Sequence, residues 1–84
     1  MIKVIIVTGA SRGIGAATAR LLGREKARVL VNYRKAKAEA DAVVRDIEGS
    51  GGRAIAVQGD MGNEDDILRV FAETDRVFGP LTGL

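Results

Sequence analysis

The sequence predicts an α/β fold in which three parallel strands form one sheet with helices on both of its faces. Three apolar runs rich in β-branched residues alternate with three longer segments in which apolar residues recur at spacings of three and four. Each connection between successive apolar runs is long enough to hold a helix, which favours parallel strands joined by right-handed crossovers. A glycine-rich turn joins the first strand to the first helix.

The first strand is predicted at residues 2–7, the glycine-rich turn at 8–15 (TGASRGIG) and the first helix after it. The strand is almost wholly apolar, as expected of a strand buried on both faces of a parallel sheet. The helix is predicted to end between 23 and 26. Its apolar stripe is predicted to consist of Ile14, Ala17, Thr18, Leu21 and Leu22.

The three glycines of residues 8–15 predict a site for a phosphate group. Gly9 allows a tight turn out of the strand, where a side chain would clash or the backbone needs a positive φ. Gly13 lets a pyrophosphate approach the main chain, and Gly15 lets the helix pack close to the strand. The helix start adds unpaired N–H groups and about half a positive charge, which favour an anion.

The second unit is predicted as a strand at 27–32 and a helix at 35–48. Residues 49–52 (GSGG) are interpreted as the cap and turn after that helix, and not as a second phosphate loop, because no helix begins after them. The apolar stripe of the helix is predicted to consist of Ala36, Ala40, Val43, Val44 and Ile47.

The third unit is predicted as a strand at 53–58 and a helix that begins after Asn63 and ends by 79–80. Asn63 is a typical N-cap with Asp66 three residues on, and the acids at 64–66 suit the positive end of a helix. Residues 81–84 are predicted to begin a fourth strand that is truncated. The apolar face of the helix is predicted to consist of Ile67, Leu68, Phe71, Val77 and Phe78.

Three such units after a glycine-rich turn predict the mononucleotide-binding half of a Rossmann-type fold, with strand order 3-2-1. Residues 1–84 would form a single, partial NAD(P)-binding domain. Without a complete fourth strand, the outer edge of the first strand would be unpaired. Such an edge predicts self-association through the first strand.

Composition excludes several classes of function. With 84 residues, 46% hydrophobic and 29% charged, the chain has room for one small domain. It contains no cysteine and no histidine, so we expect no disulfide, no metal site and no histidine-based catalysis. No apolar run approaches the roughly 20 residues of a membrane span, and Met1 leads directly into a strand without a signal peptide, which predicts a cytoplasmic protein. A net charge of +2 with interleaved signs argues against nucleic acid as a partner.

The spacing T-G-x-x-x-G-x-G of residues 8–15 resembles the cofactor loop of the short-chain dehydrogenase/reductase family. Two more motifs, at 32–34 (NYR) and 59–61 (GDM), stand where that family places its adenosine-binding residues. The resemblance covers the whole chain and about the first third of a family member. It is strongest to the 3-oxoacyl-carrier-protein reductase and glucose dehydrogenase-like branches.

The resemblance implies roles for individual residues in binding a dinucleotide. Asp60 would accept a hydrogen bond from the adenine amino group, and the backbone N–H of Met61 would serve a ring nitrogen. Ser11 and Ile14 would contact the phosphates through backbone groups. An alternative role for Asp60 is to cap the turn before the next helix.

Two arginines favour NADP(H) over NAD(H) as the cofactor. By the family register, the position of the ribose-binding acid is Tyr33, which is not acidic, and Arg34 follows it. Arg12, inside the glycine-rich turn, would reach the same 2′-phosphate from the other side, and guanidinium groups bind phosphate through charge-assisted hydrogen bonds. The alternative is that Arg34 and Lys35 form a solvated helix start, and NAD remains possible.

No catalytic residue is predicted in this chain. Tyr33 and Lys37 match the family's catalytic Tyr-x-x-x-Lys spacing, but we interpret the match as a coincidence because Tyr33 ends the second strand, at the adenosine end. The family's catalytic serine, tyrosine and lysine would lie beyond Leu84.

The resemblance therefore implies the NADP(H)-binding N-terminal segment of an oxidoreductase that transfers hydride between a nicotinamide and a carbonyl or alcohol substrate. The segment alone is expected to be inactive. The alternative is a non-catalytic nucleotide-binding or self-associating module.

Overall fold

The structure is a computed structural model that describes residues 3–9 and 13–79 of the chain. All three predicted strand–helix units are present, and the strand at 53–58 has the predicted bounds. Residues 81–84, predicted to begin a fourth strand, lie outside the described residues. In chain order, the elements are β1 (Val4–Val7), α1 (Gly13–Arg24), β2 (Arg28–Tyr33), α2 (Lys37–Gly49), β3 (Arg53–Gln58) and α3 (Glu64–Phe78).

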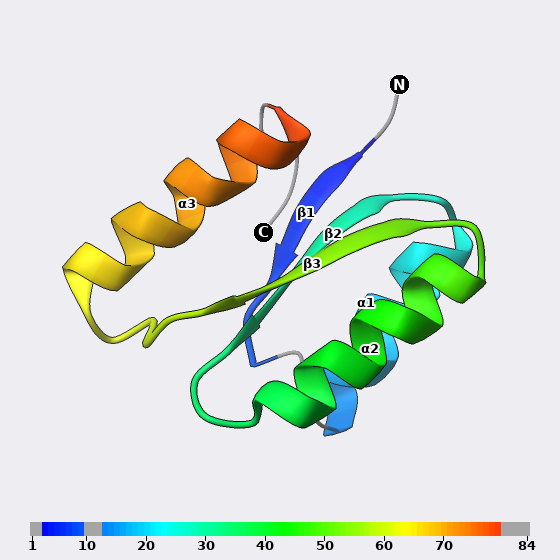
Figure 1. Cartoon of the computed structure of the whole chain (residues 1–84), viewed down its shortest axis with the longest axis horizontal. Coiled ribbons are helices and arrows are strands. Elements are labelled where there is room, and N and C mark those ends of the chain that lie inside the picture. The colour runs from blue at the N-terminus through cyan, green and yellow to red at the C-terminus, as the bar shows by residue number, and fades with distance from the viewer. Residues whose placement is uncertain (1–2, 10–12, 80–84) are drawn as a thin grey trace.

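The three strands form one parallel sheet in the order β1-β2-β3. Arg28 at the start of β2 pairs with Val4 on one side and with Arg53 on the other. Helices α1 and α2 cover one face of the sheet and α3 covers the other (Figure 1). The predicted α/β class, the strand order and the helices on both faces are confirmed.

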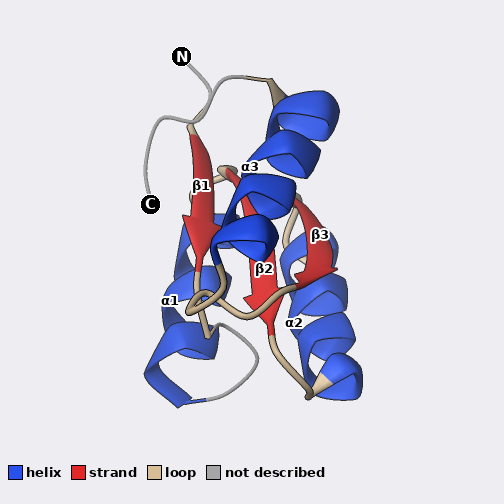
Figure 2. Ribbon diagram, turned by 90° about the vertical axis from the view of Figure 1, so that its left-hand side faces the viewer, coloured by secondary structure: helices blue, strands red, loops and turns tan. Residues whose placement is uncertain are grey.

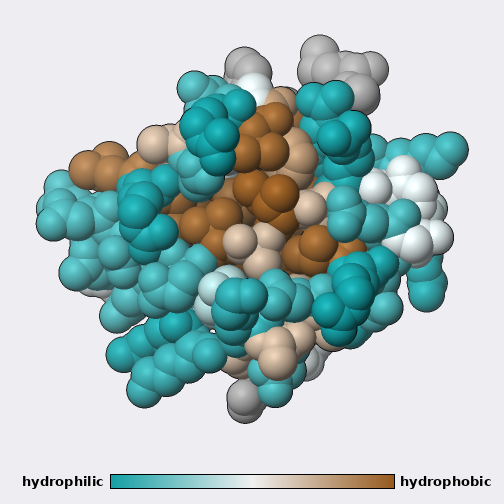
Figure 3. All heavy atoms as spheres, viewed as in Figure 1, coloured by the Kyte–Doolittle hydropathy of each residue, from teal (hydrophilic) through white to brown (hydrophobic). Residues whose placement is uncertain are grey.

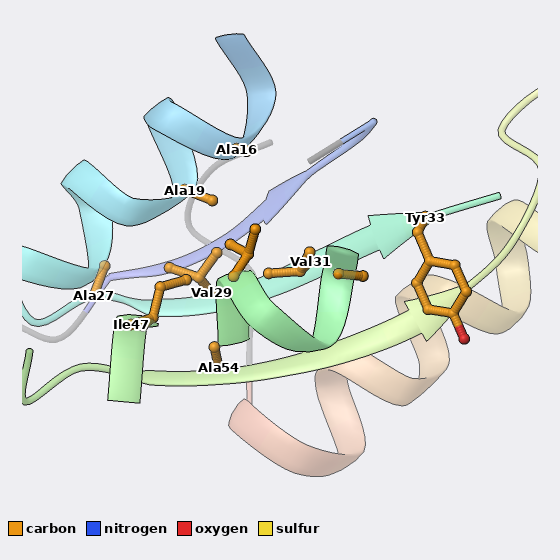
Figure 4. Close-up of a cluster of buried hydrophobic side chains, with 10 residues drawn as sticks. Ala16, Ala19, Ala27, Val29, Val31, Tyr33, Ile47 and Ala54 are labelled. Atoms are coloured by element: carbon orange, nitrogen blue, oxygen red, sulfur yellow. The ribbon is translucent and has the colours of Figure 1, made fainter. Parts of the chain in front are cut away.

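Strand β2 forms the centre of the hydrophobic core because both of its faces are covered. Val29 and Val31 pack towards α1 and α2, whereas Leu30 packs with Ile6 and Val70 under α3. This is why β2 is a continuous apolar run rather than an alternating one. Apolar residues also gather at the centre of the face shown in Figure 3, with hydrophilic residues around them. The larger cluster (Figure 4) consists of Ala16, Ala19, Ala27, Val29, Val31, Tyr33, Ala40, Val43, Ile47 and Ala54.

Small residues, not large ones, form the buried face of α1, so the predicted stripe of that helix is wrong. Ile14 is 87% exposed and Leu21 is 55% exposed, and only Leu22 of the predicted stripe is even half-buried. The reason is the close approach of α1 to α2: a Cβ added to Gly23 would lie 2.6 Å from Cγ2 of Ile47. The residues that are buried in α1 are Ala16, Ala19 and Gly23.

The buried face of α3 also differs from the predicted one, whereas all the buried residues of α2 belong to its predicted stripe. In α3, Val70, Thr74 and Phe78 are buried, and only the last of these was predicted. Thr74 is tolerated in the core because its hydroxyl donates to the Val70 carbonyl at 2.8 Å. In α2, the buried residues are Ala40, Val43 and Ile47. The predicted residues Leu68, Phe71 and Val77 of α3 are exposed.

Candidate nucleotide-binding site

The segments that follow the three strands lie at one edge of the sheet (Figure 2), because all three strands run in the same direction. These segments contain the three motifs singled out in the sequence, at 8–15, 32–34 and 59–61. Residues 10–12 lie outside the described residues, so the structure says nothing of Ser11 and Arg12. The described parts of the motifs meet where an α/β sheet of this kind binds its ligands.

The described glycines of the first turn leave room beside the N-terminus of α1. Gly9 has φ +60° and Gly13 has φ +58°, a backbone region that side chains rarely adopt. A Cβ added to either residue would meet nothing within 4 Å. Gly15, which has no side chain, lies half-buried in the first turn of α1, and the Ile14 side chain is exposed.

The N-termini of α1 and α3 differ in how their charge is balanced. The first turn of α1 contains no acidic residue, whereas that of α3 contains Glu64, Asp65 and Asp66. In α3, the Asn63 side chain also accepts a hydrogen bond from the Asp66 N–H at 3.0 Å. The dipole of α3 is therefore compensated by its own residues. Among the described residues, the start of α1 has no acidic side chain in its first turn and no atom near the Cβ positions of Gly9 and Gly13, and a helix N-terminus of this kind suits a phosphate group.

The turn after β3 presents one backbone donor. Within 59–63, the Met61 N–H has no hydrogen-bond partner among the described residues. The other four backbone N–H groups of this turn donate to acceptors within the protein, so the Met61 N–H is its one backbone donor without a partner among the described residues. The acceptors of the other four N–H groups are the Tyr33 carbonyl for Gly59, Asp66 Oδ2 for Asp60, Asp60 Oδ1 for Gly62 and the Asp60 carbonyl for Asn63.

The Asp60 carboxylate has two neighbours, one for each oxygen. Oδ1 accepts a hydrogen bond from the Gly62 N–H at 2.8 Å, so the alternative role of Asp60 as a turn cap is present in the structure. Oδ2 lies 3.7 Å from Nε of Arg34, whose side chain is 68% exposed. The structure thus brings together two of the predicted contact residues, Asp60 from the end of β3 and Arg34 from the end of β2.

Tyr33 and Lys37 have different partners in the structure. Tyr33 is 8% exposed and belongs to the larger core cluster (Figure 4), and its carbonyl accepts from the Gly59 N–H at 2.9 Å. The Lys37 ammonium donates to Asp41 Oδ2 at 2.8 Å, and this hydrogen bond raises the pKa of Lys37 above its usual value. The charged form of Lys37 is therefore stabilised by a carboxylate on its own helix.

Two polar side chains that were not assigned a role connect the ends of β2 and β3. Asn32 is 3% exposed, and its amide donates to the Gly59 carbonyl at 3.1 Å and to the Val57 carbonyl at 3.4 Å. Gln58 donates to the Arg34 carbonyl at 3.2 Å. A polar residue at the end of an otherwise apolar strand is the sequence signal for such a link. These bonds hold the segments at the ends of β2 and β3 against each other.

In the described residues, no helix is both long and apolar enough to cross a membrane.

Comparisons with known proteins agree with this geometry. The family model described as short chain dehydrogenase matches residues 3–84. Versicolorin reductase 1 of Aspergillus parasiticus is 48% identical over 79 residues, which make up 94% of this chain and 30% of that protein.

Solved structures show the same relationship. A dehydrogenase/reductase from Sinorhizobium meliloti 1021 superposes with a TM-score of 0.90 at 44% identity, over 94% of this chain and 31% of that one. The promiscuous reductase LugOII, which catalyses keto-reduction at C1 during lugdunomycin biosynthesis, superposes with a TM-score of 0.80 at 42% identity, over 92% of this chain and 33% of that one. The chain spans about a third of the length of these relatives, and it belongs to the short-chain dehydrogenase family.

Proposed function

We propose that this chain is the NADP(H)-binding segment of an oxidoreductase that transfers hydride between a nicotinamide and a carbonyl or alcohol carbon. The observation that carries the proposal is the pair of positive-φ glycines, Gly9 and Gly13, with open space beside them at a helix start that has no acidic residue. The fit is chemical as well as spatial, because a pyrophosphate needs backbone donors, close main-chain approach and a positive field.

The phosphates would be held at the start of α1. Gly9, Gly13 and Gly15 would allow the pyrophosphate to reach the main chain, and Ser11 and Ile14 would donate backbone N–H groups to it. The Ile14 side chain is exposed and does not pack in the core.

The adenine would be held by the turn after β3. Adenine carries an amino donor next to a ring-nitrogen acceptor, so it needs an acceptor and a donor side by side in the protein. Asp60 Oδ2 and the Met61 N–H are such a pair, since Asp60 Oδ1 is occupied by Gly62 and the Met61 N–H is unused among the described residues. This complementarity supports the predicted roles of Asp60 and Met61.

The preference for NADP(H) rests on Arg34, with Arg12 as its predicted partner. Arg34 is exposed, and its nearest carboxylate, on Asp60, is 3.7 Å away, so its guanidinium can turn to a 2′-phosphate without breaking a short hydrogen bond. Tyr33 would border the ribose mainly through its backbone, because its ring is buried. NAD(H) is the alternative cofactor.

Titration of the chain with NADPH and NADH tests this proposal. Arg34→Asp should lower the ratio of NADPH to NADH affinity about 10- to 100-fold, because a charge-assisted hydrogen bond is worth about 1.5–3 kcal/mol. Lys35→Asp is the matched control, since it makes the same charge change on the next residue, which is also exposed. An unchanged ratio in Arg34→Asp would contradict the NADP(H) assignment.

The chemistry of the parent protein extends beyond this chain. When bound, the nicotinamide cofactor supplies hydride-transfer chemistry, and the residues described above would bind and orient its adenosine half. We propose that the 84-residue segment is inactive alone, because the family's catalytic serine, tyrosine and lysine have no counterparts among the residues assigned here. Keto-reduction by LugOII supports a carbonyl substrate for the parent. The 3-oxoacyl-carrier-protein reductase and glucose dehydrogenase-like branches, and a cytoplasmic location, stay predictions.

A second candidate function is self-association through β1. Among the described residues, β1 pairs with β2 alone. Val4 and Ile6 are already buried, whereas Ile5 and Val7 are half-buried and border a hollow of about 200 Å³ between β1 and α1. Sedimentation across a wide concentration range tests this candidate. A monomer at all concentrations would contradict it.

A further inference from the structure

We propose that Asp66, in the first turn of α3, positions the turn at 59–63 for adenine through the hydrogen bond that its carboxylate accepts from the Asp60 backbone N–H. This inference rests on the proposed function, because it concerns the adenine end of the same site. It makes Asp66 a positioning residue that acts on Asp60 and Met61 without touching the ligand.

The bond between Asp66 and Asp60 replaces a more local arrangement. In a capping box, the residue at the position of Asp66 would accept from the N–H of the N-cap residue, Asn63. Here the Asn63 N–H donates to the Asp60 carbonyl at 2.9 Å, and Asp66 Oδ2 accepts from the Asp60 N–H at 2.9 Å instead. The Asp66 carboxylate therefore connects the start of α3 to the peptide between Gly59 and Asp60, at the beginning of the turn.

This arrangement determines which donor and acceptor the turn presents. With its N–H held by Asp66, the Asp60 residue cannot rotate its backbone to offer that N–H to a ligand. The Asp60 carboxylate accepts from the Gly62 N–H, which leaves the Met61 N–H as the backbone donor of the turn without a partner among the described residues. Without the bond from Asp66, Asp60 and Met61 would have to be ordered when the ligand binds, at an entropic cost.

A second link extends the effect to the loop after β2. Arg69, one turn along α3, lies 3.4 Å from Asp66 Oδ1 and donates to Gln58 Oε1 at 3.4 Å. Gln58 in turn donates to the Arg34 carbonyl at 3.2 Å. The start of α3 thus holds the turn after β3 directly and is linked to the loop after β2 through Gln58.

The protonation state of Asp66 agrees with this geometry. Its pKa is lowered, first by the hydrogen bond from the Asp60 backbone, with desolvation opposing the shift and Arg69 assisting it. The other charged groups near the turn are the carboxylates of Asp60, Glu64 and Asp65 and the guanidinium of Arg34. Asp66 is therefore an ionised acceptor at neutral pH.

The affinity test uses adenosine monophosphate as the probe, alongside NADPH, on the full chain. Asp66→Ala should weaken binding of both ligands about five- to tenfold, less than the loss of a direct charge-assisted hydrogen bond to the ligand, because Asp66 acts only through the turn. Asp66→Asn keeps a neutral acceptor and should recover part of the affinity. Asp65→Ala is the matched control, because it removes the same charge from the same helical turn at an exposed position.

An NMR titration separates positioning from a general loss of structure. The Asp60 amide proton should follow the acid titration of Asp66 in the wild type, because its N–H donates to the Asp66 carboxylate. In Asp66→Asn, the dependence of the Asp60 amide shift on the ionisation of Asp66 should disappear. The Gly62 amide, which is bonded to Asp60 Oδ1 and not to Asp66, should have the same chemical shift at neutral pH in both proteins. An Asp60 amide that titrates identically in wild type and Asp66→Asn would overturn the inference.

The failure of the inference can be distinguished from the failure of the proposed function. If the wild type binds both ligands and Asp66→Ala binds them equally well, the inference is wrong and the proposed function stands. If the folded wild type binds neither ligand, the proposed function is wrong and the inference falls with it.

Discussion

Gly13→Ala gives the sharpest test of the phosphate site, because its cost in stability can be separated from its cost in binding. Gly13 has φ +58°, so an alanine there pays about 1–2 kcal/mol for a left-handed backbone. The new methyl group meets nothing within 4 Å, so no steric cost is added in the free protein. We expect the melting temperature to fall by roughly 4–8 °C for each kcal/mol lost.

Binding should suffer more, since the methyl group would occupy the space through which a pyrophosphate approaches the main chain. Loss of one hydrogen bond to a charged phosphate costs about 1.5–3 kcal/mol, which is about 10- to 100-fold in NADPH affinity. Calorimetric titration at a temperature where the variant is folded measures this change directly.

Gly51→Ala is the matched control for Gly13→Ala. Gly51 has φ +92°, an added Cβ meets nothing within 4 Å, and it lies in the turn before β3, at the other end of the sheet. The control should lose a similar amount of stability and no NADPH affinity. If Gly13→Ala binds NADPH as tightly as Gly51→Ala does, the glycine-rich turn is not the phosphate site.

Three further changes test the packing and the electrostatics. Gly23→Ala should destabilise the fold by about 1–2 kcal/mol in urea unfolding, because overpacking against Ile47 at 2.6 Å exceeds the helix-propensity gain of about 1 kcal/mol. Gly49→Ala, whose Cβ meets nothing within 4 Å, should not destabilise it, and equal stabilities would contradict this packing argument. Asn32→Asp should lower the free energy of unfolding by about 3 kcal/mol or more, because it replaces a buried donor with a carboxylate that faces two carbonyl oxygens. A variant that melts at the wild-type temperature would refute this expectation. Because the pKa of Asp66 is lowered from 3.8, the stability that its ionised carboxylate contributes is complete above pH 3.8 and is lost as the pH falls through the lowered pKa. Thermal melts in acid should therefore show a smaller loss of stability in Asp66→Asn than in the wild type. Parallel pH profiles of the two proteins would contradict this assignment.

The strands and their order could be predicted from the sequence, whereas two helix faces could not. The strand at 53–58 lies between glycine turns, so its bounds follow from local chemistry. In α1 and α3, apolar size was taken as a sign of burial. The buried faces instead contain Gly23 in α1 and Thr74 in α3. Gly23 fits because α1 lies close to α2, and Thr74 fits because its hydroxyl makes a local hydrogen bond. Neither property is visible in hydrophobic periodicity.

The loops of the site could be located from the sequence, but the contacts between them could not. Gly9, Gly13 and Asp60 were found from spacing and from their places after strands. The ion pair of Arg34 with Asp60 depends on the register that places Tyr33 opposite Gln58, which only the assembled sheet fixes. The bond from Asp66 to the Asp60 backbone was missed because the sequence pattern resembles an ordinary helix cap.

The sequential order of the sheet bears on how the chain assembles during synthesis. Every strand pairs with the next in the chain, at separations of 24 residues for Val4 with Arg28 and 25 for Arg28 with Arg53. Each pairing therefore closes a chain segment of similar length, at a similar entropic cost. We expect the sheet to grow one strand at a time as the ribosome releases it. Of the three segments that follow the strands, the turn at 59–63 would be completed last, since the Asp60 N–H is held only once Asp66 has been synthesised.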